Sequence, residues 1–221
     1  MITVALRSML PPGVGIAARS IADGQPPLWP GEEVAVRHAI PARRQEFAAG
    51  RAVARAAMQD AGLEPAALPA GPDRAPRWPT GVAGSISHAA GVAAGLAGRS
   101  AVWAGIGLDI EKAAPLDADL AAIIRASGDC DGSELGADLS ATLAFSAKEA
   151  AFKAQFPLTG LWLDHREVGV TLTPTSFTVV VRDVPLIGRW MRADGMFLSI
   201  LLAGPEQARQ LGSLDVDVVA R

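Results

Sequence analysis

The sequence predicts an α+β fold, and two observations support that prediction. Stretches with the helical spacing of 3.6 residues and stretches with the two-residue spacing of strands follow one another irregularly, without the strand–helix alternation of a doubly wound sheet. Half of the 221 residues are hydrophobic, which is enough to build a substantial core. The length suits one large domain or two small domains of about 100 residues each.

The N-terminal part is expected to contain a strand and a long helix. Residues 1–10 alternate loosely between apolar and polar side chains and are interpreted as a strand. From residue 41 to residue 61 the apolar side chains recur at helical spacing, and Gly62 then predicts the end of this helix. The apolar side of the helix is expected to carry Phe47, Ala54, Met58 and Ala61.

The rest of the chain is expected to hold several strands and two further helices. Residues 62–81 are rich in proline and glycine and are interpreted as an irregular connection. A short helix is predicted over residues 117–126, and a firm helix is predicted to start near Ser146. The predicted strands cover residues 82–87, 91–97, 101–111, 167–173, 176–182 and 196–203.

Lysine is used sparingly in this sequence. Only three of the 20 basic residues are lysines, and all three lie in two acidic motifs, GIGLDIEK at residues 105–112 and FSAKEAAFKA at residues 145–154. A surface ion pair tolerates arginine, whereas a compact ammonium group and a planar guanidinium differ when the partner is a reacting phosphate. The positions of Lys112, Lys148 and Lys153 therefore favour a site that handles phosphate.

The motif GIGLDIEK predicts a strand with one aliphatic and one acidic face. Its alternate residues Ile106, Leu108 and Ile110 would face a core, which places Asp109 and Glu111 together on the other face. Adjacent carboxylates repel each other unless a cation lies between them, and oxygen ligands at this spacing suit Mg²⁺. The alternative is a half-exposed strand that carries two solvated acids.

The motif FSAKEAAFKA has two structural explanations beside the functional one. Ser146 and Glu149 have the S-x-x-E form of a capping box, which would start a helix. Glu149 and Lys153 also have the spacing of a surface ion pair. The functional hypothesis is that the carboxylates and ammonium groups of the two acidic motifs together hold a metal, a diphosphate and a proton acceptor.

The predicted helix at residues 41–61 carries a basic stripe. Arg44, Arg51 and Arg55 fall close to one line along the helix, and Arg43 adds charge at its start. A solvated helix face explains this pattern without any function. The alternative is a phosphate clamp, because the guanidinium fork suits phosphate oxygens.

The segment SISHAAG places Ser87 and His88 at the end of a short apolar strand. The small residues that follow would let a ligand approach the backbone closely, and Arg74 lies just upstream. A lone histidine is more often structural than functional. The other two histidines, His38 and His165, have no comparable setting, and the absence of a His/Cys cluster argues against zinc.

The composition argues against several classes of function. A net charge of −3 provides no basic coat for nucleic acid. Cys130 is the only cysteine, so no internal disulfide and no thiolate metal cluster can form, which favours a reducing compartment. No stretch reaches the ~18 uninterrupted apolar residues of a membrane span, and prolines interrupt the apolar start of the chain before it could serve as a signal peptide. We therefore expect a cytoplasmic protein that binds neither membranes nor nucleic acid.

Four motifs in this order resemble the 4′-phosphopantetheinyl transferases, in particular the larger surfactin-synthetase-activating type. They are the basic helix, the segment from WP to SISH, GIGLDIEK and FSAKEAAFKA. The resemblance covers approximately residues 40–170, and the last two motifs are highly specific as a pair.

The resemblance implies a fold and a reaction. The family folds as two similar α+β halves related by pseudo-twofold symmetry, here residues 1–105 and 106–221, with coenzyme A bound between them. A chain of this length resembles the monomeric type. The family moves the phosphopantetheine arm of coenzyme A onto a serine of an apo acyl or peptidyl carrier protein in a magnesium-dependent reaction that releases 3′,5′-ADP. The carrier could belong to fatty-acid, polyketide, nonribosomal-peptide or siderophore synthesis, and the sequence does not decide between them.

The resemblance also implies roles for single residues. Asp109, Glu111 and Glu149 match the ligands of Mg²⁺, with Mn²⁺ as an alternative metal, and Glu149 is also the candidate catalytic base. Lys153 matches the catalytic lysine beside the diphosphate. The residues expected to bind coenzyme A are Arg43, Arg44, Arg51, Arg74, Ser87, His88, Lys148 and Lys153.

Two positions depart from the family pattern. Residue 75 is alanine where some relatives have lysine, and Arg74 would supply that charge instead. Residue 89 is alanine where relatives usually have a hydroxyl or thiol group. These differences concern the nucleotide contacts rather than the reaction.

Two other functions remain as alternatives. One is a magnesium-dependent hydrolase acting on coenzyme A or a nucleotide, and the other is a non-catalytic subunit that only binds a carrier protein. A surface for the carrier is expected to be apolar with basic groups. It is expected near Phe152, Phe156 and Trp162, although such aromatic residues also suit a core.

Overall fold

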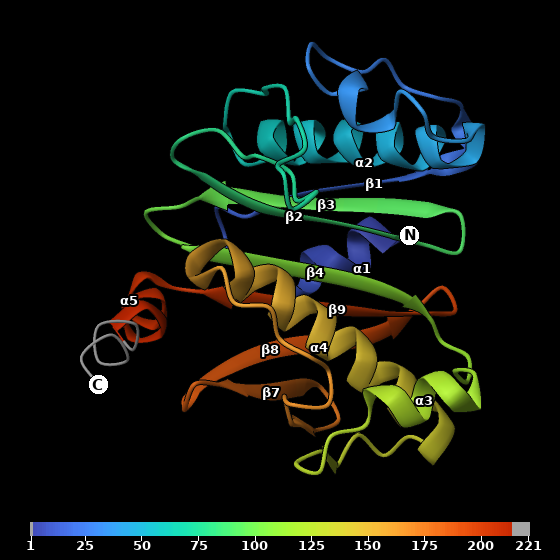
Figure 1. Ribbon diagram of the computed structural model, residues 1–221, viewed down its shortest axis with the longest axis vertical. Coiled ribbons are helices and arrows are strands. Elements are labelled where there is room, and N and C mark those ends of the chain that lie inside the picture. The colour runs from blue at the N-terminus through green and yellow to red at the C-terminus, as the bar shows by residue number, and fades with distance from the viewer. Residues whose placement is uncertain (1, 214–221) are drawn as a thin grey trace.

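The computed structural model describes residues 2–213, which form five α-helices, two short 3₁₀ helices and nine strands. The last eight residues of the expected C-terminal half, 214–221, lie outside the described part. Two sheets lie one above the other in Figure 1, and each carries one long helix. This arrangement confirms the predicted α+β class.

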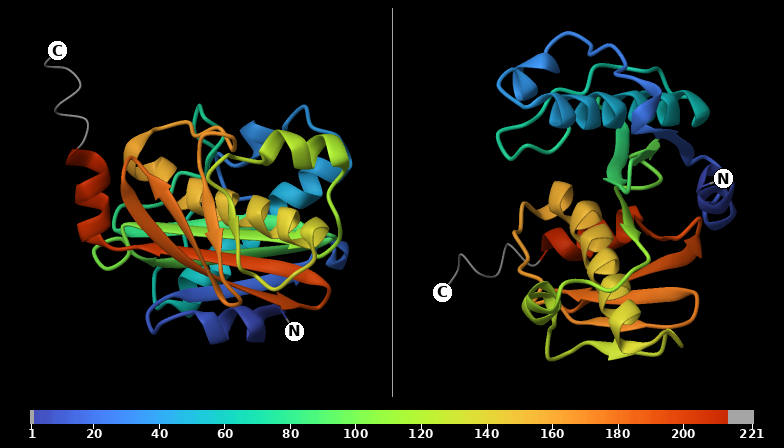
Figure 2. Two further views of the ribbon diagram at one scale, coloured as in Figure 1. Left: turned by 90° about the horizontal axis from the view of Figure 1, so that it is seen from below. Right: turned by 90° about the vertical axis from the view of Figure 1, so that its right-hand side faces the viewer.

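The smaller sheet is antiparallel and is covered by the predicted long helix, α2 (Pro41–Asp60). Small side chains fill this interface, with Ala49, Val53 and Ala93 in one buried cluster. The side view of Figure 2 shows α2 lying across this sheet as the upper lobe of the molecule. In spatial order, the sheet consists of β1 (Gly15–Ser20), β3 (Val92–Arg99) and β2 (Val82–Ala89).

The larger sheet has six strands and is covered by α4 (Ala137–Thr159). Its ladders are antiparallel except for the short parallel pair at one edge. Two shorter helices flank it, α3 (Ala118–Ile124) and α5 (Pro205–Ser213). In spatial order, the strands are β4 (Gly105–Lys112), β9 (Met196–Ala203), β8 (Val184–Ala193), β7 (Ser176–Val181), β6 (Val170–Leu172) and β5 (Cys130–Asp131).

The predicted N-terminal strand is wrong, because residues 2–9 form the helix α1 (Ile2–Met9). Its buried residues Ile2, Leu6 and Met9 recur at intervals of four and three, which is helical spacing. The loose alternation of this segment is compatible with both periods, and packing against the core decides for the helix. The strands β1, β5 and β8 and the helix α5 were not predicted from the sequence.

The capping box predicted at Ser146 is also wrong. Helix α4 begins nine residues earlier, after Gly136, which has no side chain to announce a cap. Ser146 is fully buried in the middle of the helix, where its hydroxyl donates a hydrogen bond of 2.9 Å to Ser199 on β9. Glu149 is therefore not a capping partner, and this structural explanation for its presence no longer applies.

Strand β4 joins the two sheets. Its aliphatic residues Ile106, Leu108 and Ile110 are buried, as predicted, in a core to which α1, β1, β3 and β9 also contribute. At the edge of β4 that is not paired with β9, the backbone N–H groups of Leu108 and Ile110 donate to the hydroxyls of Ser85 and Ser87 on β2, at 2.9 and 3.2 Å. Serine side chains thus replace a backbone ladder where the sheets meet.

No helix in residues 2–213 is long and apolar enough to cross a membrane.

Substitution of Gly107 by alanine is expected to destabilise the fold strongly. A Cβ atom at this position would lie 1.8 Å from the carbonyl oxygen of Ala150 on α4, so the helix would have to move away from β4. We expect a loss of about 3 kcal/mol in the free energy of unfolding, at the upper end of ordinary overpacking costs, measured by chemical denaturation.

Gly136→Ala is the matched control, because nothing lies within 4 Å of the added Cβ and the backbone there is extended. A Gly107→Ala protein as stable as this control would contradict the proposed contact.

Candidate active site

Three elements bring polar side chains together where the two lobes meet. Asp109 projects from β4, Ser87 from β2 and Lys153 from α4. The ammonium group of Lys153 lies 2.6 Å from Oδ1 of Asp109, and the Ser87 hydroxyl donates to the same oxygen at 3.0 Å. Asp109 and Lys153 are 44 residues apart in the sequence, so the two acidic motifs share one site.

Asp109 is the buried centre of this group. Its second oxygen, Oδ2, is buried without a hydrogen-bond partner. Burial raises the pKa of this carboxyl group, and the charge of Lys153 opposes that rise. An unpaired buried carboxylate oxygen is costly, so Asp109 is suited to receive a cation or another donor.

The two other acidic residues differ from each other in their ionisation. Burial, followed by the charge of Asp109, raises the pKa of Glu111 from 4.5 to about 7. Burial alone would raise the pKa of Glu149 too, but the hydrogen bond from His165 and the charge of Lys153 together lower it. Besides burial, the charges of Asp109 and Glu149 raise the pKa of Glu111, so the three carboxylates repel one another. A cation between them would relieve this repulsion.

The three carboxylates do not form a finished metal site. Within residues 2–213, no three His, Cys, Asp or Glu side chains are gathered closely enough to hold a metal ion. Lys153 already supplies a positive charge at Asp109. The chemistry of the donor set and the unpaired Oδ2 of Asp109 fit a divalent cation, and the three-carboxylate site stays a prediction.

The role of His165 could not be predicted from the sequence. Its Nε2 lies 2.9 Å from Oε1 of Glu149, and its ring stacks on Phe145 with centroids 5.2 Å apart. The histidine lies 16 residues beyond Glu149, in the irregular loop that follows α4 and folds back along it. Loops carry no periodic pattern, so nothing in the sequence announces such a return contact.

Lys148 is held by three protein acceptors. Its ammonium group lies 2.8 Å from the carbonyl oxygen of Ile124, 2.9 Å from that of His165 and 2.9 Å from the carboxylate of Asp129. An ammonium group has three protons, and all are used here. The predicted contact of Lys148 with phosphate stays a prediction, and it would require one of these bonds to break.

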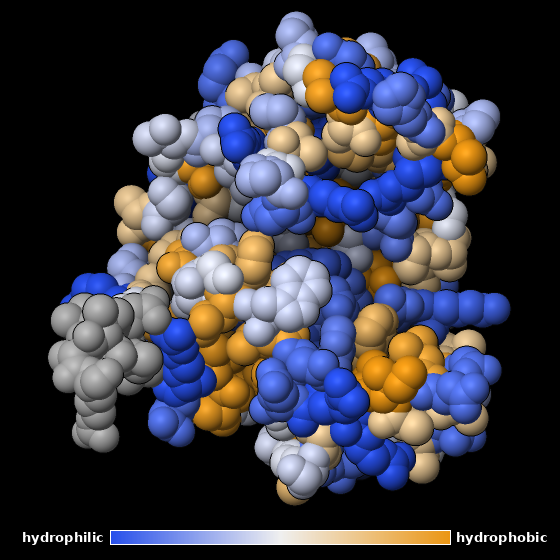
Figure 3. Space-filling view, in the orientation of Figure 1, coloured by the Kyte–Doolittle hydropathy of each residue, from blue (hydrophilic) through white to orange (hydrophobic). Residues whose placement is uncertain are grey.

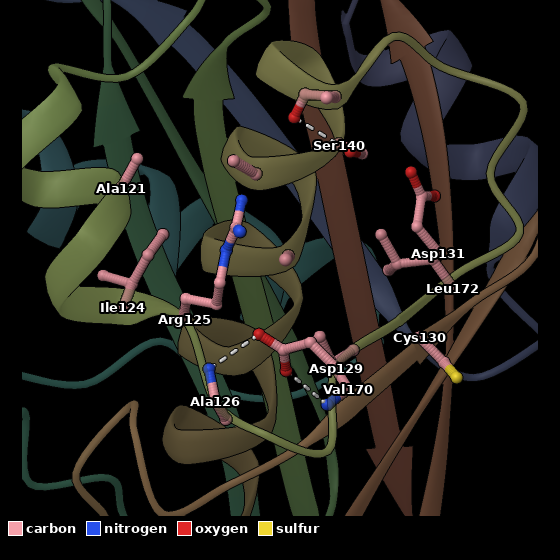
Figure 4. Close-up of a pocket in the computed structure, with 13 residues that line it drawn as sticks. Ala121, Ile124, Arg125, Ala126, Asp129, Cys130, Asp131, Ser140, Val170 and Leu172 are labelled. Atoms are coloured by element: carbon pink, nitrogen blue, oxygen red, sulfur yellow. Dashed lines mark hydrogen bonds between the residues drawn. The ribbon is translucent and has the colours of Figure 1, made fainter.

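Asp129, the partner of Lys148, lies at the edge of a cavity of about 280 Å³ between α3 and α4. Figure 4 shows its carboxylate accepting hydrogen bonds from the backbone N–H groups of Ala126 and Val170. Lys148 and Asp129 therefore tie the loop after α3 to α4 and to β6.

The start of the basic helix meets the histidine segment, as the phosphate hypothesis requires. Nη1 of Arg43 lies 3.2 Å from Nε2 of His88. Burial is the main cause that lowers the pKa of His88, so its ring is neutral near pH 7 and Nε2 accepts from Arg43. Arg44 is half-buried on the same helix, whereas Arg74 is exposed on a turn and joins this group through no hydrogen bond or ion pair of the described residues.

The rest of the basic stripe is buried rather than solvated. Arg51 donates from Nε to the carbonyl of Leu68 at 2.6 Å, and its Nη2 is buried without a partner. Burial lowers the pKa of Arg51 to about 10. Arg55 forms a buried ion pair of 2.6 Å with Glu32. The explanation of this stripe as a solvated helix face is therefore wrong for Arg51 and Arg55.

The face of the molecule in Figure 3 shows where these groups lie. Hydrophilic side chains gather over its middle, between the lobe of α2 and the lobe of α4. A charged ligand placed there would meet residues from both lobes.

Glu111 is expected to contribute to the free energy of unfolding of the metal-free protein. This contribution falls as the pH rises through about 7. Folding raises the pKa of this carboxyl group from 4.5 to about 7, so the folded chain keeps a proton that the unfolded chain releases. This contribution is complete below pH 4.5 and is lost as the pH passes 7.

Melting temperatures of the wild type and of Glu111→Gln, measured with a chelator at pH 5 and pH 8, test this expectation. The glutamine variant, which cannot ionise, should gain stability relative to the wild type at pH 8. An equal difference at both pH values would contradict the raised pKa.

Comparisons with known proteins agree with the motifs. The family model "4′-phosphopantetheinyl transferase N-terminal domain" matches residues 31–98. The chain is 36% identical over 199 residues to 4′-phosphopantetheinyl transferase Svp of Streptomyces mobaraensis, covering 80% of each chain. It is 30% identical over 221 residues to 4′-phosphopantetheinyl transferase Npt of Nocardia iowensis, covering 89% of this chain and 98% of Npt.

A further relative is enterobactin synthase component D of Salmonella typhimurium. The identity to it is 37% over 199 residues, which cover 80% of this chain and 79% of the relative. With relatives that match along most of their length, the chain belongs to the 4′-phosphopantetheinyl transferase family.

Proposed function

We propose that this protein transfers 4′-phosphopantetheine from coenzyme A to a serine hydroxyl of an apo acyl or peptidyl carrier protein. The serine oxygen forms a bond to the phosphorus that carries the pantetheine arm, the diphosphate P–O bond breaks, and 3′,5′-ADP leaves. The observation that carries this proposal is the contact of Lys153 with Asp109, beside Glu149, in a member of this family. Such a reaction needs positioning and charge neutralisation rather than an enzyme nucleophile.

Mg²⁺, or Mn²⁺ in its place, would be held by Asp109, Glu111 and Glu149. When bound, it would neutralise charge on the diphosphate oxygens. The unpaired Oδ2 of Asp109 and the raised pKa of Glu111 support this assignment, because both indicate carboxylates that lack a sufficient counter-charge.

The side chains of this protein would divide the remaining work. Glu149 has a lowered pKa, so it is ionised and able to accept the proton of the carrier serine. Lys153 lies at the edge of the group, with its side chain 26% exposed, where it can neutralise the phosphate of the leaving nucleotide. Arg43 and His88, which contact each other, would hold the 3′-phosphate.

The other residues predicted to bind coenzyme A differ in how far their contacts support that role. The buried, unpartnered Nη2 of Arg51 supports a role in anion binding. Ser87 is committed to Asp109 and to the backbone of β4, so we assign it a structural place in the site. Arg44, Arg74 and Lys148 rest on the family resemblance alone.

We also propose the division into halves at residues 105 and 106, with coenzyme A between them. Each half has a sheet covered by a long helix, antiparallel throughout in the first half and antiparallel except for the β5–β6 pair in the second, and the halves meet where β2 lies beside β4. The match to the N-terminal family domain, residues 31–98, falls inside the first half. We expect the protein to act as a monomer, because Ser87, Asp109 and Lys153 of one chain meet at the site. We expect it in the cytoplasm, because its single cysteine favours a reducing compartment.

The carrier protein is proposed to dock beside the aromatic cluster of Phe152, Phe156 and Trp162. The rings of Phe152 and Phe156 stack with centroids 5.1 Å apart, and Trp162 packs edge-on against Phe152. Trp162 is nevertheless 78% exposed, in the loop that follows the end of α4 at Thr159. An exposed tryptophan supported by two half-buried rings is a favourable anchor for a partner.

Intact mass of an apo carrier protein, after incubation with this protein, coenzyme A and Mg²⁺, tests the reaction directly. We expect a mass gain of one phosphopantetheine that a chelator abolishes. Asp109→Asn should abolish it too, because the amide keeps the shape of the carboxylate but not its charge. Asp138→Asn, an exposed acid at the start of α4, is the control.

Three results would contradict the proposal. Breakdown of coenzyme A without a mass gain indicates the hydrolase alternative. No change in coenzyme A or in any of several carrier types indicates the binding-only alternative. Full activity of Asp109→Asn with an intact metal requirement removes Asp109 from the site.

Trp162→Ala is expected to weaken carrier binding without affecting the chemistry. A truncated anchor residue typically costs 1 kcal/mol or more of binding energy, so KM for the carrier should rise about fivefold or more while KM for coenzyme A stays constant. Ile187→Ala, at an apolar residue on β8 that is 62% exposed, is the control. Unchanged carrier kinetics in the Trp162 variant would place the docking surface elsewhere.

A further inference from the structure

Within residues 2–213, His165 is the one histidine with a hydrogen bond to an acidic residue of the proposed site. Its side chain is 31% exposed and that of Glu149 is 25% exposed, so their hydrogen bond of 2.9 Å is partly protected from water. An ionised carboxylate can only accept hydrogen bonds. Nε2 of His165 must therefore carry the proton and donate it to Oε1 of Glu149.

His165 is itself held at two points. Its ring stacks on Phe145, one turn before Glu149 on α4, with an interplanar angle of 21°. Its backbone carbonyl accepts from the ammonium group of Lys148, the residue next to Glu149. The helix thus fixes the histidine through the neighbours of Glu149, and the histidine in turn fixes the Glu149 side chain.

We propose that His165 is a positioning residue of the transfer reaction: its Nε2–H holds Oε1 of Glu149, so that Oε2 faces the reacting groups. The proposal deepens the proposed function and depends on the role assigned there to Glu149. A glutamate side chain has three rotatable bonds, and fixing one carboxylate oxygen removes most of that freedom before substrate binds.

The same geometry gives Lys148 a part in the site. Because all three of its protons are donated to protein acceptors, its contribution is to keep the His165 loop against α4. Lys148 and Glu149, adjacent in the sequence, thus hold the backbone and the ring of the same residue.

Two substitutions separate the hydrogen bond from the packing. His165→Phe keeps a ring that stacks on Phe145 but has no donor, whereas His165→Gln keeps an N–H donor without the ring. We expect His165→Phe to lower kcat about 10- to 100-fold, as is typical for groups that orient a ligating or reacting side chain. KM for coenzyme A and the melting temperature should stay close to wild type, and His165→Gln should regain part of kcat. His38→Phe, at an exposed position, is the control.

A double-mutant cycle with Glu149→Ala tests whether His165 acts through Glu149. In that background His165→Phe should cause no further loss of kcat, because the group that it positions is gone. A further loss similar to that in the wild type would show that His165 acts in another way, and would overturn the proposal.

Imidazole ¹⁵N NMR provides a readout without metal, coenzyme A or turnover. The chain has three histidines, so the His165 signals can be assigned by their loss in His165→Phe. In the wild type, Nε2 should be the protonated nitrogen, and Glu149→Ala should shift its signal. No shift would mean that the hydrogen bond does not exist in solution, and the proposal would fall.

The kinetic outcomes also separate this proposal from the assignment of Glu149. A wild-type kcat in His165→Phe, or a loss that accompanies a lower melting temperature and is not restored by glutamine, overturns the positioning role alone. A wild-type kcat in Glu149→Ala overturns the role of Glu149, and the role of His165 with it.

Discussion

The close approach of α4 to β4 is the constraint on which the site depends. Gly105 and Gly107 face the helix, and a Cβ atom on either would lie within 2.3 Å of a carbonyl oxygen of α4. Asp109 follows at the same spacing on the same face, so the distance set by the two glycines also sets its distance to Lys153. The short distance between β4 and α4, which the two glycines permit, therefore brings the charges of Asp109 and Lys153 together.

The serine bridges between β2 and β4 serve a second purpose at the same place. In the described part of the chain no backbone ladder joins β2 to β4, and the hydroxyls of Ser85 and Ser87 accept from the N–H groups of Leu108 and Ile110 instead. Ser87 uses its own proton for Asp109. One residue thus bridges β2 to β4 and donates to the buried carboxylate, so a substitution of Ser87 would affect both the fold and the site.

The sequence predicted the parts of this structure that depend on periodicity or on a specific motif. The alternation in GIGLDIEK correctly identified both faces of β4, and the spacing in residues 41–61 correctly identified α2. The start of α4 was missed because its N-cap residue, Gly136, has no side chain that could signal a cap. Helix α1 was missed because its eight residues fit both the helical and the strand spacing. His165 and the buried state of Arg51 and Arg55 could not be predicted, because loops that return to a helix decide both.

The buried pair of Glu32 and Arg55 restricts how this chain can be recombined with its relatives. Glu32 also accepts hydrogen bonds from the backbone N–H groups of Trp29 and Leu68, so one carboxylate holds two loops and the helix between them. Loss of one partner from a buried pair leaves a charge without compensation, which is far more costly than loss of both. A chimera that exchanges α2 without both loops would inherit half of this arrangement, so the segment from residue 29 to residue 68 behaves as a single unit of exchange.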